Sequence, residues 1–207
     1  MNKLLTAAAF LALTVTAAPL AADGPKAEKP APEPGFTPLF NGKDLHGWHV
    51  MNKGRFSVRD GVIFLDGGGG WLRSDKEYQD FELRLEFRFL EKGANSGIFF
   101  RAVKEGANYP AKTYQVQTMD HPSLGSIYTS ALPAPKEKKD EALLKKVMKP
   151  AGEWQAYVIR VRGRRVTVQV NGEPINAAEG LADPAGYLGI QGEGGKLEFR
   201  HVRIKEL

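Results

Sequence analysis

Residues 81–89, FELRLEFRF, alternate without exception between a large apolar side chain and a charged one. A β-strand turns successive side chains to opposite faces, so this stretch would place all its apolar residues on one face and all its charges on the other. A helical period would scatter the charges around the whole circumference. The stretch therefore predicts a strand that packs one face on a core and turns the other to water.

Further strands are expected on both sides of this one, separated by turn residues. Asp60-Gly61 follows Arg59 between apolar runs at 56–58 and 62–65, and Asn171-Gly172 follows three alternating valines and precedes a return strand at Pro174-Ile175. Both dipeptides favour tight hairpins, because Asn, Asp and Gly tolerate positive φ. Three more strands are expected at 154–162, 187–191 and 196–205, the last with a β-bulge between Phe199 and Val202, where the apolar phase switches.

Many short strands with few helical segments are typical of an all-β, two-sheet jelly-roll sandwich. The chain has 207 residues and no cysteine, which excludes disulfides, thiol nucleophiles and cysteine-ligated metals. A folded part of about 170 residues can bury an adequate core without disulfides.

The N-terminal residues predict export rather than structure. Residues 1–22 combine Lys3, an uncharged apolar run and small residues near Ala21-Ala22, which is typical of a secretory signal peptide; a retained anchor is the alternative. Residues 23–35 hold four prolines and are expected to be a linker, with the folded domain at 36–207. The expected location is the periplasm or the extracellular space, with no membrane span after cleavage.

The net charge of +5 is modest, and most basic residues alternate with acids. A nucleic-acid partner is not expected, because such binders concentrate charge in a patch. The densest stretch, 136–149, holds six lysines diluted by three acids, and is expected to be a solvated insertion with a helical turn near 142–148; a polyanion site is the alternative.

Two segments carry candidate binding residues. In the first, glycines flank Asn95-Ser96, which suits either a sugar-binding turn or a plain β-turn. In the second, Gln115 and Gln117 share one face of a strand while Tyr114, Val116 and Thr118 share the other. Paired amides need partners and would suit a wet groove, although an exposed strand would also explain them.

Asp120-His121 follows the glutamines and supplies a carboxylate and an imidazole, the usual proton-handling pair. Tyr128 lies on the short return strand that comes next. Other catalytic templates fail: Gly67–Gly70, expected between two strands, lacks the lysine of a phosphate loop, and no Gly-x-Ser-x-Gly or His-Glu-x-x-His occurs. The four histidines lack compact ligand spacing, so no metal ligands are assigned and a divalent metal cofactor would have no clear ligand set.

An ordered series of motifs resembles the 3-keto-disaccharide hydrolase family, long catalogued as a domain of unknown function. The resemblance spans 35–207 and is carried by 35–48 (GFTPLFNGKDLHGW), 78–83 (YQDFEL), 94–101 (ANSGIFFR), 114–117 (YQVQ), 125–128 (GSIY), 149–154 (KPAGEW), 170–172 (VNG), 189–191 (GIQ) and 199–205 (FRHVRIK). It implies a concanavalin A-like jelly roll whose curved sheet binds sugar, and glycosides already oxidised to a ketone at C3 as substrates.

The resemblance also implies site residues. Arg101, Gln117 and Tyr128 match motif positions expected to face the groove, with Asn95 and Ser96 at its edge and Gln115 beside them. We expect His121 to accept the C2 proton and Asp120 to orient it. Elimination of the C1 oxygen would follow, and addition of water would give net hydrolysis; stopping earlier would give a lyase outcome.

Two departures from the family pattern bear on activity. The family often has Glu where this chain has Gln115, and many members carry Gln-Asp-His-Gly where this chain has Gln191-Gly192-Glu193-Gly194. The sequence therefore favours an enzyme acting on 3-keto-glycosides, with a non-catalytic carbohydrate-binding module of the cell envelope as the alternative. A scaffold domain without sugar affinity is the third possibility.

Overall fold

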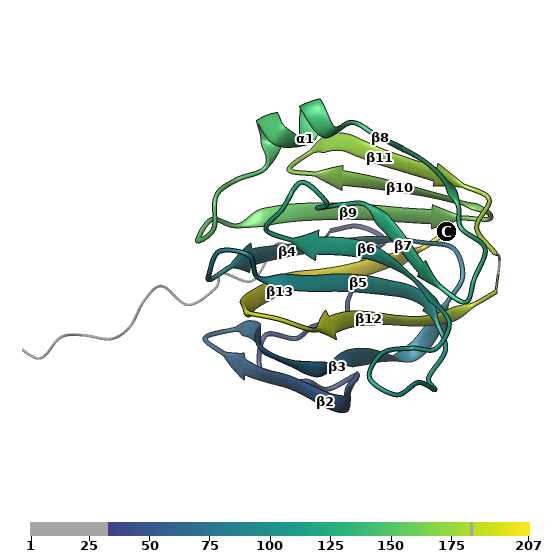
Figure 1. Cartoon of the computed structure of the whole chain (residues 1–207). Helices are drawn as coiled ribbons and strands as arrows, with labels where there is room; N and C mark the ends of the chain where they lie inside the picture. The colour runs from purple at the N-terminus through teal and green to yellow at the C-terminus, as the bar shows by residue number, and fades with distance from the viewer. Residues whose placement is uncertain (1–32, 183) are drawn as a thin grey trace, which may run out of the picture.

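A computed structural model describes residues 33–182 and 184–207, which form an antiparallel β-sandwich (Figure 1). The predicted signal peptide at 1–22 and most of the predicted linker lie outside the described residues. The strands are β1 (Thr37–Pro38), β2 (Trp48–Arg59), β3 (Val62–Tyr78), β4 (Phe81–Phe89), β5 (Asn95–Ala102), β6 (Thr113–Met119), β7 (Ile127–Ser130), β8 (Lys136–Lys139), β9 (Gln155–Arg162), β10 (Arg165–Val170), β11 (Glu173–Glu179), β12 (Gly186–Gly192) and β13 (Lys196–Glu206), with one helix, α1 (Glu141–Val147).

The strands form two layers that share β3. The front sheet, nearer the viewer in Figure 1, runs β7-β6-β5-β12-β3, with β2 on the far side of β3. The back sheet runs from β3 through β13, β4, β9, β10 and β11 to β8. The predicted all-β sandwich is confirmed.

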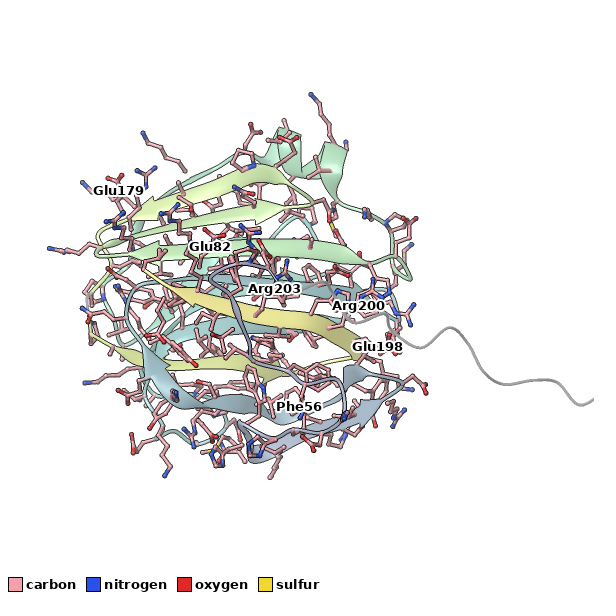
Figure 2. All side chains as sticks on the ribbon, turned by 180° about the vertical axis from the view of Figure 1, so that it is seen from behind. Phe56, Glu82, Glu179, Glu198, Arg200 and Arg203 are labelled. Carbon is pink, nitrogen blue, oxygen red and sulfur yellow. The ribbon has the colours of Figure 1, made fainter. Side chains whose placement is uncertain are left out.

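The alternation of β4 is confirmed residue by residue, because all five of its apolar side chains are buried and all four charged ones are partly exposed. The apolar side chains join a single large core cluster between the sheets. The charged ones form ion pairs on the outer face of the back sheet: Arg88 with Glu198 at 2.5 Å, and Glu86 with Arg200 at 2.7 Å. Figure 2 looks onto this face.

The first structured contact comes earlier than Phe36. Glu33 forms ion pairs with Arg84 and Arg203, the latter at 2.8 Å, and the Arg84 guanidinium lies 4.5 Å from the centre of the Phe36 ring. The chain is therefore fixed to the back sheet from Glu33 onward.

The expectation that Gly67–Gly70 separates two strands is wrong, since β3 runs through them as one strand. Residues 63–66 pair with β13 in the back sheet, and residues 70–73 pair with β12 in the front sheet. Gly67 and Gly68 have φ values of 69° and 114°, which L side chains rarely adopt. The glycines thus let one strand bend from one sheet into the other.

Both predicted hairpins and the predicted bulge are confirmed. Asp60 and Gly61 have positive φ values of 47° and 79°, and Asn171 and Gly172 have 52° and 91°, as a type I′ turn requires. In β13 the register shifts between Arg200 and Arg203, which turns both Phe199 and Val202 inward. In the lysine-rich insertion the predicted helical turn is confirmed as α1, whereas its first residues form β8 and pair with β11, which was not predicted.

Tyr157 of β9, in the back sheet, reaches across the core to the front sheet. Its side chain is buried, its ring lies 4.6 Å from that of Phe87, and its hydroxyl donates to the backbone carbonyl of Gln117 at 2.7 Å. Burial raises the pKa of Tyr157, so the phenol stays a hydrogen-bond donor.

Replacing Tyr157 by Phe should lower the free energy of unfolding by about 1 kcal/mol, because it removes one buried hydrogen bond and keeps the ring. Urea denaturation measures the change, with Tyr128→Phe as a control, since Tyr128 is 48% exposed. Equal stabilities for the two variants would contradict the role given to the Tyr157 hydroxyl.

Candidate functional site

A cluster of four side-chain amides lies on the outer face of the front sheet, contributed by β5, β6 and β12. The Gln115 amide nitrogen donates to the side-chain oxygens of Gln117, at 2.5 Å, and Gln191, at 3.2 Å; the Gln117 amide nitrogen donates to the Asn95 side-chain oxygen at 2.7 Å. These three strands are hydrogen-bonded neighbours (Figure 1). We call these residues the amide cluster.

The amide cluster confirms the face predicted for Gln115 and Gln117. Tyr114, Val116 and Thr118 are buried in the core-facing direction, and the two glutamines point the other way. Gln191, which the sequence supplied only as part of a motif, was missed as a site residue because its partners come from a strand 76 residues away.

Glycines make room for the cluster. Gly97 lies opposite Gln117 in the register, and a Cβ there would sit 2.5 Å from Gln115 Cδ, so the Gln115 amide lies directly over the Gly97 backbone. Gly189 plays the same part for the neighbouring indole, since a Cβ there would lie 2.8 Å from Trp71 Cζ3 and closer still to Cε3. The two glycines therefore let the Gln115 amide and the Trp71 ring lie close to the backbone on the outer face of the sheet.

The hydrogen bonds within the amide cluster leave some of its donors and acceptors free to bind a ligand. Among the described residues, the Asn95 and Gln191 amide nitrogens donate no side-chain hydrogen bond, and the Gln115 amide oxygen accepts none. Two donors and one acceptor on one face match the needs of sugar hydroxyl or carbonyl groups.

Asn95, Ser96 and Tyr128 occupy three different places. Asn95, which is predicted at the edge of a sugar-binding groove, belongs to the amide cluster. The Ser96 side chain is buried and donates to the Gln191 carbonyl at 2.6 Å, so it supports the face from beneath rather than contacting it. Tyr128 pairs with Gln115 across the β6–β7 register and is half exposed, which places it beside the cluster.

Arg101 does not face this site, and its predicted role in the groove is corrected by its position. Its side chain is fully buried, and its guanidinium donates to the backbone carbonyls of Ala182 and, at 2.6 Å, Gly163. The cause is an irregularity where β5 pairs with β12: Arg101 has a φ of 51°, and the register shifts beside it. The bulge turns the side chain away from the outer face.

Asp120 and His121 lie beyond the end of β6 but do not bind each other. Asp120 accepts a hydrogen bond from the Gly93 backbone at 3.2 Å, while the Ser123 backbone donates to His121 Nδ1 at 3.1 Å. Within the described chain no hydrogen bond joins the two side chains, so Asp120 does not orient His121 here. Because Nδ1 accepts from Ser123, the proton of the neutral imidazole resides on Nε2.

Glu193 is a further candidate that sequence reasoning treated only as the loss of a histidine. It follows Gly192 of β12, and Gly194 pairs with Asn95 in an isolated bridge. Desolvation raises the pKa of Glu193, and its carboxylate in turn contributes to a raised pKa of Tyr109, after burial of the phenol itself. Along the chain, Glu193 precedes Gly194, the bridge partner of Asn95, and His121 lies two residues after Met119, the β6 partner of Asn95.

An apolar patch adjoins the amide cluster on the same face. Trp71 of β3 pairs with Gln191 in the register, and its ring meets that of Phe99 edge to face at 5.8 Å. Tyr109 covers Phe99 at 6.1 Å, and Arg73 lies 4.3 Å over the Tyr187 ring. Aromatic rings beside polar amides are typical of carbohydrate sites, because sugar rings have apolar C–H faces.

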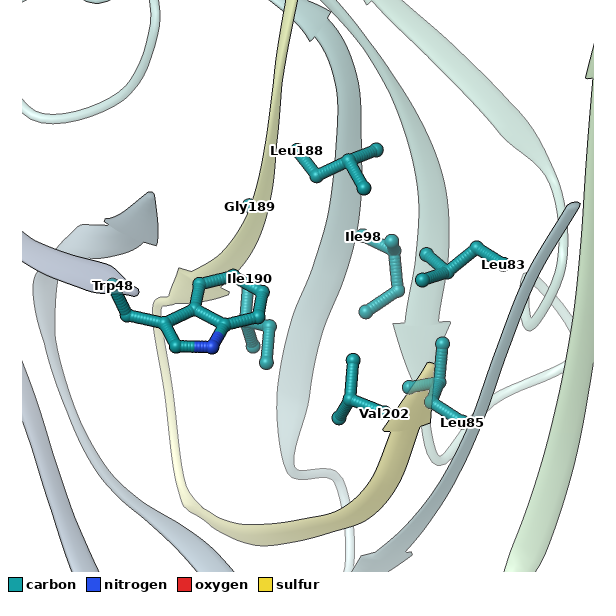
Figure 3. A pocket seen from close by; sticks show the side chains of 8 residues that line it. All are labelled: Trp48, Leu83, Leu85, Ile98, Leu188, Gly189, Ile190 and Val202. Atoms are coloured by element: carbon teal, nitrogen blue, oxygen red, sulfur yellow. The ribbon is translucent and has the colours of Figure 1, made fainter. Parts of the chain in front are cut away.

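A cavity between the sheets is not a sugar site. Its lining is apolar: Trp48, Leu83, Leu85, Ile98, Leu188, Gly189, Ile190 and Val202 (Figure 3). A sugar placed there would lose its hydroxyl hydrogen bonds, which is strongly unfavourable.

Two absences apply to residues 33–182 and 184–207. No group of three or more His, Asp or Glu side chains there could hold a metal ion. No helix in this part has the length and apolar character needed to cross a membrane.

Comparison with known proteins gives one family and one curated relative. The family model for the 3-keto-alpha-glucoside-1,2-lyase-like domain matches residues 35–205. A 3-keto-disaccharide hydrolase of Bacteroides thetaiotaomicron is 26% identical in an alignment that covers 90% of this chain and 83% of the relative.

Solved structures agree on the fold. One solved structure is of a Parabacteroides distasonis protein named a putative glycosyl hydrolase. It has a TM-score of 0.63 at 24% identity, and the alignment covers 84% of this chain and 94% of that one. The carbohydrate-binding module CBM66 from Bacillus subtilis has a TM-score of 0.55 at 14% identity, covering 77% and 95%. At these identities the similarity shows the sandwich fold alone.

Replacing Gly97 by Ala should displace the Gln115 amide, because the added Cβ would overlap it. The backbone φ of Gly97 suits any residue, so unfolding should change by no more than about 1 kcal/mol. Side-chain amide resonances of Asn95, Gln115, Gln117 and Gln191 should shift in nitrogen–proton correlation spectra. Gly194→Ala is the matched control, since a Cβ there meets open space; unchanged amide resonances in Gly97→Ala would contradict the packing described.

Proposed function

Because the chain belongs to the 3-keto-alpha-glucoside-1,2-lyase-like domain family, we propose that it is a carbohydrate-acting enzyme that cleaves glycosides oxidised to a ketone at C3. The observation that carries the proposal is the amide cluster, with unused donors on Asn95 and Gln191. We also propose that residues 1–22 direct the protein out of the cytoplasm, which the mass of the purified native protein would test.

A ketone at C3 sets what the site must do. It acidifies the proton at C2, and removal of that proton gives an enolate whose charge resides on the C3 oxygen. The enolate expels the C1 oxygen with its substituent, leaving an unsaturated ketone; water then adds at C1 and C2 is reprotonated. Amide donors placed at the C3 oxygen would stabilise the developing negative charge, and Asn95 and Gln191 have the donors for this.

Proton abstraction is assigned to Glu193 on chemical grounds. A carboxylate with a raised pKa is a stronger base than an ordinary one, and Glu193 directly precedes Gly194, which bridges Asn95. The sequence favoured His121 for this step, but the Nδ1 lone pair of His121 already accepts from Ser123. His121 Nε2–H is instead suited to donate a hydrogen bond to the leaving C1 oxygen, which takes its proton from the carboxyl group that received the C2 proton.

The function is tested with the purified protein, a methyl α-glucoside oxidised at C3 and its unoxidised parent. Cleavage of the keto compound alone is expected, because only the ketone acidifies C2–H. Parallel reactions with EDTA report any metal requirement. Binding of either sugar without cleavage would replace the enzyme by a carbohydrate-binding module, and the absence of both would reject a sugar function.

The roles proposed for Glu193 and His121 differ in their dependence on the leaving group. Glu193→Gln should lower kcat about 100-fold or more for every 3-keto-glycoside, because each needs C2 deprotonation. His121→Ala should lower kcat for a methyl glycoside but barely for a nitrophenyl glycoside, whose leaving oxygen is stable without a hydrogen bond. The reverse pattern would return the acceptor role to His121, and unchanged turnover in both variants would remove both residues from the mechanism. Asp75→Asn is the control variant, because the Asp75 carboxylate pairs with His49 at the β2–β3 edge of the sheet.

A further inference from the structure

The turn that joins β6 to β7 is held by side chains from the edge of the back sheet. Lys139 of β8 donates to the Pro122 carbonyl at 2.5 Å and to the Ser126 hydroxyl at 2.9 Å. Asn176 of β11, which pairs with Lys139 in the register, donates to the Gly125 carbonyl at 2.8 Å. In Figure 1, β8 and β11 lie at the upper edge of the sandwich. The edge of one sheet therefore fixes a turn of the other.

The Lys139 ammonium is partly withdrawn from water. Burial lowers the pKa of Lys139, although the carboxylates of Glu137 and Glu141 oppose this change. An ammonium in such a place needs acceptors, and the turn supplies two of them. Glu137 adds a bond of its own, since it accepts from the Ile127 backbone N–H at 3.3 Å, where β7 begins. One lysine of the insertion that was expected to be solvated thus faces the neighbouring turn instead.

A single peptide group separates Lys139 from His121. The Pro122 carbonyl, which accepts from Lys139, belongs to the same peptide as the Ser123 N–H. This N–H donates to His121 Nδ1 at 3.1 Å. In a trans peptide such as this one, the carbonyl and the N–H point in opposite directions. The ammonium therefore binds one end of the peptide and the imidazole binds the other.

The ammonium strengthens the hydrogen bond at the far end of this peptide. A charged donor at a carbonyl polarises the amide, which makes its N–H a better donor. A better donor at Nδ1 of His121 favours the tautomer that carries its proton on Nε2. The Nε2–H is the group that the proposed function directs at the leaving oxygen. The lysine thus favours the form of the imidazole that this role needs.

The same turn is bound to β6, the strand that carries part of the amide cluster. The Gln117 N–H donates to the Ser126 carbonyl at 2.9 Å, and the Gly125 N–H donates to the Gln117 carbonyl at 2.8 Å. Ser126 therefore binds Lys139 through its hydroxyl and β6 through its carbonyl. The lysine and the strand of the amide cluster thus hold one turn between them.

We infer that Lys139 is a positioning residue, which holds His121 as the Nε2–H tautomer through the peptide between Pro122 and Ser123. The inference rests on the proposed function for what His121 does to a substrate. The link between the lysine and the imidazole exists without a substrate, so it can be measured without one.

Nuclear magnetic resonance tests the link at a pH where the imidazole is neutral. Lys139→Met keeps the length of the side chain and removes the charged donor. The Ser123 amide proton should move upfield, and the two imidazole nitrogen resonances of His121 should approach each other, because both tautomers become populated. Lys138→Met is the matched control, since this neighbour is exposed and its side chain leaves the opposite face of β8. Unchanged Ser123 and His121 resonances in Lys139→Met would overturn the inference.

Two milder variants keep the test decisive if Lys139→Met is unstable. Lys139→Arg retains a charged donor and should preserve the imidazole resonances of the wild type. Lys139→Gln retains a neutral donor and should move these resonances part of the way. Identical resonances in Lys139→Gln and the wild type would contradict the part given to the ammonium charge.

Turnover separates positioning from a general loss of structure. In Lys139→Met, the kcat for methyl 3-keto-α-glucoside should fall about 10-fold, which is within the cost of a misplacement of about 1 Å at a reacting group. The kcat for a nitrophenyl 3-keto-glucoside should barely change. Adding Lys139→Met to His121→Ala should lower kcat no further, because the lysine acts through the imidazole. An equal loss in the presence and absence of the imidazole would overturn the inference.

The two proposals fail separately. If the wild type cleaves no 3-keto-glycoside, the proposed function fails, and the resonances of Ser123 and His121 still decide whether Lys139 fixes the tautomer. If the wild type cleaves the keto-glycoside but Lys139→Met leaves those resonances unchanged, only the link through the peptide is overturned.

Discussion

The structure depends on the burial of one face of β4. Five large apolar side chains from nine residues enter the core, and each lies against residues of the facing sheet. At about 1.5–3 kcal/mol for each buried side chain, this strand outweighs any single polar contact of the molecule. Because a shift of one residue would bury Glu and Arg instead, the same burial also fixes the register of β13 and β9.

The two outer faces differ in how far their polar groups are satisfied. On the back sheet, the charged side chains of β4 are matched by those of β13, and the ion pairs leave few groups for a ligand. On the front sheet, the outer face carries amides and aromatic rings with unused hydrogen-bonding capacity. Tyr157 connects the two sheets, because its hydroxyl reaches from the back sheet to the backbone of Gln117, a member of the amide cluster.

The sequence predicted what depends on local pattern. Alternation placed Gln115 and Gln117 on one face, and Asn171-Gly172 and the phase switch before Val202 gave a turn and a bulge in the right places. It failed for the orientation of Arg101. This residue continues the alternation of an apolar strand, but its positive φ turns the side chain into the protein. It failed also where neighbours in sequence are held by different partners, as Asp120 is by Gly93 and His121 by Ser123.

The long-range parts of the site have no sequence pattern at all. Gln191 joins the glutamines of β6 because β12 returns to pair with β5 after more than eighty residues, and only the sheet order reveals it. The same return places Gly194 opposite Asn95, with Glu193 next to it in the chain. A motif that lacks its usual histidine therefore still carries an ionisable side chain.

A site made mainly of neutral amides suits one kind of glycoside chemistry better than another. Ordinary hydrolysis passes through a positively charged sugar and needs two carboxylates on either side of the bond. A 3-keto-glycoside reacts through a negatively charged enolate, which carboxylates around it would destabilise and amide N–H groups stabilise. The unused amide N–H donors of Asn95 and Gln191 therefore suit the second chemistry better than the first.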